Sequence, residues 1–211
     1  MVSFEVQSIN LDCISKGILL CNFIKKEVFL INAGKDFENQ FKSSVPIGVY
    51  YQRIKDPAQS FNQSDSLRFS LQNPYDCFMY LYPTLFTLEL KSTEGTSMTF
   101  YRKDFIGDGK KHTFMVKKNQ LEGLSESNKF KGVISGLVLN FRKYNHTYFL
   151  FIDDANKMIN AIDRKSFNEK DVIANNGYLI EQRLKKVKYN YNLQKFIEDM
   201  QNKILNNKGV N

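Results

Sequence analysis

Residues 132–163 read GVISGLVLNFRKYNHTYFLFIDDANKMINAID, and this stretch decides how the C-terminal part of the chain is interpreted. Its apolar runs predict three consecutive strands, over Gly132 to Phe141, Thr147 to Ile152 and Lys157 to Asp163. Gly136 marks a place where a strongly coiled strand can bend. Asp153 to Asn156 predicts a tight turn, because Asp tolerates turn conformations and bonds its own backbone. The pattern therefore indicates a three-stranded meander.

The residues after this meander predict two more strands and a closing helix. Gly177 to Glu181 predicts a fourth strand and Leu184 to Tyr191 a fifth, while the polar stretch Glu169 to Asn176 is expected to be helix or loop. Asn192 can cap a final helix. The apolar residues at helical spacing on one face of that helix are Leu193, Phe196, Ile197, Met200 and Ile204.

The stretch 132–163 resembles the first three strands of an OB-fold of the kind found in replication protein A and in telomere end-protection and telomerase accessory subunits. Those families have a glycine-bent first strand, an aromatic second strand that ends in a turn of the form IDDGTG, and an apolar third strand. Ile152, Asp153 and Asp154 match that turn, whereas Ala155 and Asn156 replace its Gly-Thr. The resemblance covers about 80 of the 211 residues. Ciliate telomerase-associated proteins are the members that it favours.

Residues 1–125 also read as strands, rich in Tyr, Phe, Leu and Thr and interrupted by all four prolines. Gly123 to Asn128 is a polar stretch of small residues that is typical of a linker. The predicted fold class is all-β, with an OB-fold barrel and its C-terminal amphipathic helix in 126–211. A β-rich module in 1–125 precedes it, as a second barrel or an elaboration of the same one. The strands expected there include Ser3 to Asn10, Gly17 to Ile31, Gly48 to Ile54, Ser66 to Gln72 and Phe78 to Leu90.

The composition of the chain indicates the cellular compartment in which the protein is expected. The longest charge-free apolar stretch, Cys77 to Leu88, is shorter than the ~18 residues that a membrane span needs, so no membrane contact is expected. Glu5 and Asp12 lie where a secretion signal would be basic and then apolar. Three cysteines without a CxxC spacing favour a reducing compartment. The expected location is nuclear if the source is eukaryotic and cytoplasmic otherwise.

The charge of the chain suits a polyanion partner. Thirty Lys and Arg against 22 Asp and Glu give a formal net charge of +8. The excess lies mostly in 126–211, which holds 15 basic and 9 acidic residues. An AT-rich genome is the alternative origin of the excess, since such genomes favour Lys, Asn and Ile codons.

Within an OB-fold, aromatic side chains stack on bases and basic side chains contact phosphates. The candidates for nucleic-acid binding are Arg142, Lys143, Tyr144, Tyr148, Arg183, Lys185, Lys186, Lys188 and Tyr189, with Tyr191 as a further aromatic. The alternative is that Tyr148 packs within the barrel and that Arg183 to Lys188 is a solvated edge strand whose lysines discourage aggregation. The candidates for partner docking on the terminal helix are Phe196, Met200 and Ile204. Packing against the barrel bottom is the alternative, and it is the role expected for Phe196 and Ile197, with the helix end near Ile204 freer to contact a partner.

The sequence shows no recognisable catalytic or metal-binding pattern. His112 and His146 each lie next to a turn, without a second ligand at metal spacing. Cys13 and Cys21 lie in apolar, strand-like surroundings that favour burial over reactivity. Gly107 to Lys111 lacks the length of a phosphate-binding loop. The prediction is therefore a protein that is not an enzyme and has no cofactor or metal.

The resulting hypothesis is a non-catalytic accessory subunit of a telomere or telomerase assembly, which docks other protein subunits and supports telomeric DNA synthesis. A protein that binds single-stranded DNA or RNA directly is the second hypothesis. A viral or structural β-protein is the third. Weak, salt-sensitive binding of nucleic acid by the isolated chain is expected under the first hypothesis, because the densest basic run has no aromatic residue before Tyr189.

Overall fold

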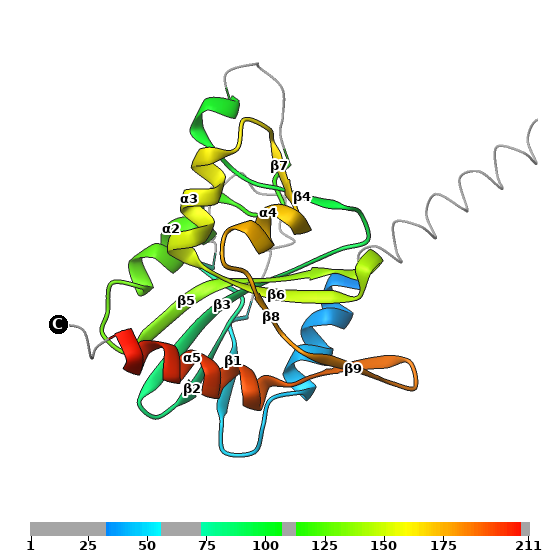
Figure 1. Cartoon of the computed structure of the whole chain (residues 1–211), viewed down its shortest axis with the longest axis vertical. Coiled ribbons are helices and arrows are strands. Elements are labelled where there is room, and N and C mark those ends of the chain that lie inside the picture. Colours follow the sequence, from blue (N-terminus) through cyan, green and yellow to red (C-terminus); the bar gives the residue numbers. More distant parts are fainter. Residues whose placement is uncertain (1–32, 56–72, 107–112, 208–211) are drawn as a thin grey trace, which may run out of the picture.

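A six-stranded mixed sheet forms the centre of the molecule (Figure 1). The computed structural model describes residues 33–55, 73–106 and 113–207. All neighbouring strands of the sheet are antiparallel except the central pair β3 and β5, which run parallel over nine positions. In spatial order the strands are β1 (Tyr50–Arg53), β2 (Cys77–Leu81), β3 (Thr84–Thr93), β5 (Val133–Phe141), β6 (His146–Phe151) and β8 (Tyr178–Leu179).

Two small two-stranded sheets and a set of helices surround this sheet. β4 (Ser97–Thr99) pairs with β7 (Ser166–Asn168), and β9 (Gln182–Lys185) pairs with β10 (Lys188–Tyr191). A first helix spans 33–43. The others are α2 (Lys118–Ser127), α3 (Ile152–Ala161), α4 (Glu169–Ala174) and α5 (Leu193–Asn207), with short 3-10 turns at η1 (Lys103–Ile106) and η2 (Arg142–Tyr144).

Helices cover both faces of the sheet, so its central strands are buried on both sides. On one face, Phe86 and Leu88 of β3 join a core that includes the 33–43 helix and α5. On the other face, Leu137 and Leu139 of β5 pack with α2 and α3. Gly136 lies where the strands approach closely, since a Cβ there would stand 2.5 Å from the Phe149 ring. The glycine expected to bend the strand thus also makes room for an aromatic side chain.

The predicted all-β barrel is wrong, because the third strand of the expected meander is a helix. Residues 152–161 form α3, with Ile152, Ala155 and Met158 buried at helical spacing. Asp153 and Asp154 lie in its first turn, where negative charge is favourable. In the described residues β1 and β8 end the sheet without pairing to each other, so the sheet is open.

Several of the predicted elements nevertheless form. The strands over 133–141 and 146–151 lie where the sequence indicated them, and α4 lies in the polar stretch expected as helix or loop. Asn192 caps α5 as predicted, since its Oδ1 accepts from the Lys195 amide at 3.3 Å. The fifth strand expected over Leu184 to Tyr191 is instead a hairpin that turns at Lys186, whose φ is 58°.

Strands from both sides of the expected boundary between 1–125 and 126–211 form one sheet, because β3 and β5 pair with each other. Gly123 to Asn128, interpreted as a linker, lies mostly in α2, whose Leu124 is buried. The expected strand Phe78 to Leu90 is divided between β2 and β3 by a turn at Pro83. Predictions for Ser3 to Asn10, Gly17 to Ile31, Ser66 to Gln72, Cys13, Cys21 and His112 lie outside the described residues.

None of the helices in the described part of the chain combines the length and the apolar character needed to cross a membrane.

Candidate functional site

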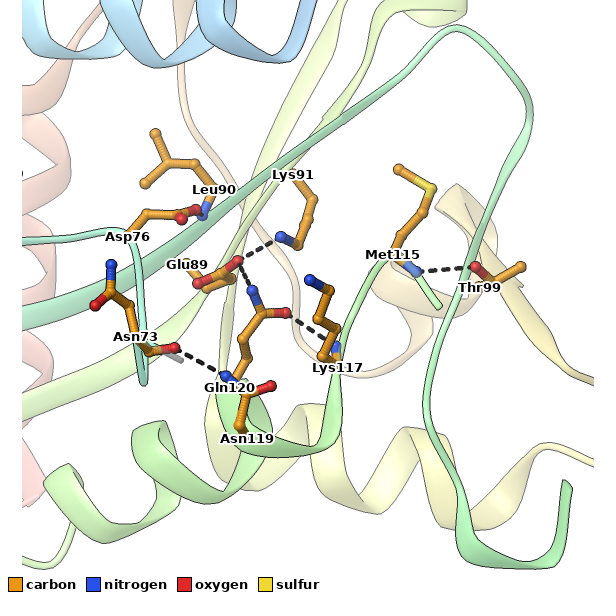
Figure 2. Close-up of polar contacts among 10 residues, drawn as sticks. All are labelled: Asn73, Asp76, Glu89, Leu90, Lys91, Thr99, Met115, Lys117, Asn119 and Gln120. Atoms are coloured by element: carbon orange, nitrogen blue, oxygen red, sulfur yellow. Dashed lines mark hydrogen bonds and ion pairs between the residues drawn. The ribbon is translucent and has the colours of Figure 1, made fainter. Parts of the chain in front are cut away.

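Charged residues meet on the face of β3 that packs against α2. The antiparallel register pairs Cys77 of β2 with Leu88 of β3, and this brings Asp76, just before β2, beside Glu89. Because side chains alternate along a strand, Glu89 and Lys91 point to the same face. We call Asp76, Glu89, Lys91 and Gln120 of α2 the β3 site (Figure 2).

Hydrogen bonds hold each carboxylate of the β3 site in place. The Asp76 Oδ2 accepts from the Leu90 amide at 2.8 Å. Glu89 Oε1 accepts from both the Lys91 amine and the Gln120 side-chain amide (Figure 2). Gln120 is itself oriented, because its Oε1 accepts from the Lys117 amide at 2.9 Å. One oxygen of Glu89 is therefore fully engaged by neighbouring donors.

The start of α2 is tied to the segment that carries Asp76. Asn119 donates from its side chain to the carbonyl of Asn73 at 2.9 Å. Before the helix, the Met115 amide donates to Thr99 Oγ1 at 3.0 Å (Figure 2). A Cβ at Gly123 would stand 2.3 Å from Pro74 Cβ, so the helix lies very close to this segment. These contacts fix Gln120 above β3.

Glu89 is a buried carboxyl group without enough partners. Its side chain is 0% exposed, and its Oε2 has no hydrogen-bond partner in the described structure. The pKa of Glu89 is raised to about 8, chiefly by burial, with the charge of Lys91 opposing the shift and the charge of Asp76 adding to it. An unpartnered buried carboxylate oxygen is costly, so it marks a place where a cation would be stabilising.

The raised pKa of Glu89 predicts that stability falls with pH when divalent cations are absent. The folded state keeps a proton that the unfolded state, with a pKa near 4.5, has released. The stabilising contribution is complete below about pH 4.5 and is lost as the pH rises through about 8, a change on the order of a few kcal/mol. Chemical denaturation in chelator across this range measures it. A slope that Glu89→Gln leaves unchanged would assign the effect to other groups.

The β3 site fits a small divalent cation. In the described residues no three His, Cys, Asp or Glu side chains form a cation site by themselves. Mg²⁺, however, is commonly held by one or two carboxylates together with water and a substrate phosphate. Asp76 and Glu89 supply two carboxylates, and the free Oε2 of Glu89 is a suitable hard oxygen ligand. The donor set therefore suits Mg²⁺ or Mn²⁺ better than Zn²⁺.

A third carboxylate, Glu38 of the 33–43 helix, lies at the same end of β2. It pairs with Arg53 at 2.7 Å, and Arg53 is the strand neighbour of Cys77. Burial is the main cause of the raised pKa of the Cys77 thiol, and the charges of Asp76, Glu89 and Glu38 add to it. Three carboxylates thus surround the first residue of β2.

The structure brings the predicted nucleic-acid residues into two groups. Arg142, Lys143 and Tyr144 lie in η2, and Arg183, Lys185, Lys186, Lys188 and Tyr189 lie in the β9–β10 hairpin. Tyr189 joins the groups, since its hydroxyl donates to Asn145 Oδ1 at 2.7 Å. The β3 site contains none of these residues.

Other predicted residues are buried. Tyr148 is 5% exposed and donates to Glu169, which also contacts His146 at 2.6 Å, so its ring lies in the core as the alternative interpretation held. Phe196 and Met200, which were candidates for docking a partner, belong to the core under α5. The side chain of Ile204 lies outside the described residues.

Sequence reasoning missed Asp76, Glu89, Lys91 and Gln120. The sequence around the expected strand Phe78 to Leu90 nevertheless contained an indication of this site. Glu89 and Lys91 follow a run of apolar and Thr residues whose length indicates a buried strand, and a charged pair in such a strand requires partners. The partners themselves come from separate segments of the chain.

Comparisons with known proteins give similar chains but no family. No known family model matches the chain. It is 29% identical over 182 residues to a protein of Bacillus subtilis strain 168 described as the SPbeta prophage-derived uncharacterized protein YotM, covering 80% of this chain and 87% of that one. Among solved structures it is similar to Archaeoglobus fulgidus Hjc, a Holliday junction resolvase. That match has 12% identity and a TM-score of 0.38, and covers 63% of this chain and 83% of the other. A likeness at this level does not assign an activity.

The resemblance to telomeric OB-folds is therefore wrong. The relative is a bacterial prophage protein, and the described strands form an open mixed sheet and not a closed barrel. The residues that suggested the acidic turn, Asp153 and Asp154, begin α3. The comparisons give no support to the prediction that the chain is not an enzyme.

Proposed function

We propose that the chain is a divalent-cation-dependent nuclease, which hydrolyses phosphodiester bonds of nucleic acid at the β3 site. The observation that carries the proposal is the Glu89 carboxyl group, fully buried with one free oxygen beside Asp76 and Lys91. A carboxylate in this position is costly to the fold and requires a function to explain it.

Each residue of the β3 site has a role in such a reaction. Asp76 and Glu89 would hold the cation, which supplies a polarised phosphoryl oxygen and an activated water when it is bound. Lys91 is partly buried, with its side chain 17% exposed, and contacts Glu89. Its charge lies where negative charge develops as water attacks phosphorus and the bond from phosphorus to the leaving oxygen breaks. Gln120 fixes the direction of Glu89.

Nucleic acid is the phosphodiester that the charge of the protein favours. The net charge of +8 attracts a polyanion. Asp76 is only half-buried and Lys117 is exposed, so the β3 site reaches the surface. Figure 2 shows the Lys117 amine on the same side of the site as Lys91, where a second phosphate of a polymer could be held.

Cleavage of DNA by the full chain tests the proposal. The wild type with Mg²⁺ or Mn²⁺ should cut a labelled duplex or branched DNA, and a chelator should stop the reaction. Asp76→Asn should lower the rate about a hundredfold or more, because it removes a cation ligand. Asp163→Asn, at an exposed position after α3, removes the same charge and should cut at the wild-type rate. Cation-independent cleavage, or equal rates for the two variants, contradicts the assignment.

The location of the protein, nuclear if eukaryotic and otherwise cytoplasmic, stays a prediction. Docking of other protein subunits and contact with single-stranded DNA or RNA stay predictions as well.

A further inference from the structure

The β9–β10 hairpin is the most basic projection of the described structure. It spans residues 182–191 and holds Arg183, Lys185, Lys186 and Lys188, all exposed, without an acidic residue. Figure 1 shows it extending beyond the sheet. We call this hairpin the basic arm.

The basic arm concentrates charge on one face. By strand alternation Arg183, Lys185 and Lys188 point to the same side, and Lys185 is paired directly with Lys188. Like charges directly opposite each other destabilise a strand pair. In the described structure no acidic side chain forms an ion pair with any of the three. An anion bound across this face would relieve their repulsion.

The other face of the arm is fixed to the body of the protein. The Tyr189 amide donates to Gln40 of the 33–43 helix at 2.8 Å, and the Tyr191 amide donates to Ser44 at 3.0 Å. Tyr191 is 3% exposed and its ring packs edge-on against Phe37. The charged face is therefore held in a set direction.

A groove of about 490 Å³ runs between the arm and η2. Arg142 and Tyr189 line it, and Asp36 is its acidic member. The Nε of Arg142 is buried without a hydrogen-bond partner in the described residues, and its guanidinium reaches Glu94 only at 3.8 Å. The groove is lined by the tyrosine face of the arm, opposite Arg183, Lys185 and Lys188, so it is separate from the charged face.

We infer that the charged face of the basic arm is a binding surface for the sugar-phosphate backbone of nucleic acid. The inference goes beyond the proposed function, because it rests on this charged face alone.

Binding of a labelled DNA duplex by the full chain in chelator, where cleavage cannot occur, tests the inference. The arm variant Arg183→Gln, Lys185→Gln, Lys188→Gln should weaken binding about tenfold or more. The slope of log affinity against log salt should fall by about 2.7, which is about 0.9 for each contact. The control variant Lys129→Gln, Lys131→Gln, Lys157→Gln removes the same charge from exposed sites in the turn before β5 and on α3.

Equal weakening by the arm and control variants would show only a general charge effect and would overturn the inference. Full affinity in the arm variant would overturn it as well. The proposed function fails separately. If the wild type shows no cation-dependent cleavage, the proposed nuclease activity is refuted. Weaker DNA binding by the arm variant would still support this surface.

Discussion

Glu89→Gln should lower phosphodiester hydrolysis by about a thousandfold or more, while it makes the cation-free protein more stable near pH 8. The amide has nearly the shape of the carboxyl group but carries no charge, so it binds a divalent cation poorly. It still offers an oxygen to Lys91 and Gln120, which now contact Glu89 Oε1. Its NH₂ can donate toward the carboxylate of Asp76, whose charge lies beside Glu89.

The expected loss of activity and the expected gain in stability are measured separately. Cleavage rates with Mg²⁺ measure the loss of activity, and denaturation in chelator at pH 6 and pH 8 measures the gain in stability. Glu126→Gln on α2 is the matched control, because Glu126 is an exposed carboxyl group. A variant that loses activity together with stability would indicate that Glu89 is a structural residue, and one that keeps activity would refute the β3 site.

The sequence predicted local structure well where the spacing of apolar residues fitted only a strand or only a helix. β5 and β6 are continuous apolar runs, and α5 carries a clear apolar stripe behind a capping Asn192. The prediction failed at residues 152–163, where the pattern fits both a helix and a turn followed by a strand. Asp153 and Asp154 are as favourable in the first turn of a helix as in a hairpin turn. Tertiary packing decided between them, because Met158 and Ile159 reach the core only in the helix.

The β3 site could be predicted only in part. Glu89 and Lys91 are adjacent on one face by strand alternation alone. Asp76 joins them through the register of β2 and β3, which depends on the turn at Pro83. Gln120 belongs to α2, and the second half of this helix was predicted to be a linker. Such a site depends on contacts over about 30 residues of chain, which periodicity does not encode.

The prediction of an OB-fold also failed because the fold depends on long-range contacts. The motif at Ile152 is three residues long, and a barrel would have required the chain to continue as a strand after it. Instead β5 pairs in parallel with β3, a strand from before residue 125. A parallel pair needs a long crossover, and α2 with the segment before it supplies one. This long-range pairing has no local signature in the sequence.

Phe196→Ala should destabilise the protein by about 3 to 5 kcal/mol, because it removes a ring from the centre of the core between α5 and the sheet. Phe196 is 0% exposed. Its ring centroid lies 5.1 Å from that of Phe149 and 5.7 Å from that of Phe86, while Tyr178 contacts it at 5.8 Å. Aromatic pairs of this geometry contribute beyond the area that they bury.

Thermal and chemical denaturation of Phe196→Ala, compared with Asn202→Ala on the exposed side of α5, measures this effect. The control should change stability by less than about 0.5 kcal/mol. Phe196 was also a candidate for docking a partner, and the two roles separate cleanly. A ring that supports the core lowers the melting temperature without selective loss of a partner, whereas unchanged stability with lost association would mean that α5 leaves the sheet to bind another protein. Because the apolar face of α5 is covered by β3 and β6 within the chain itself, the first outcome is expected.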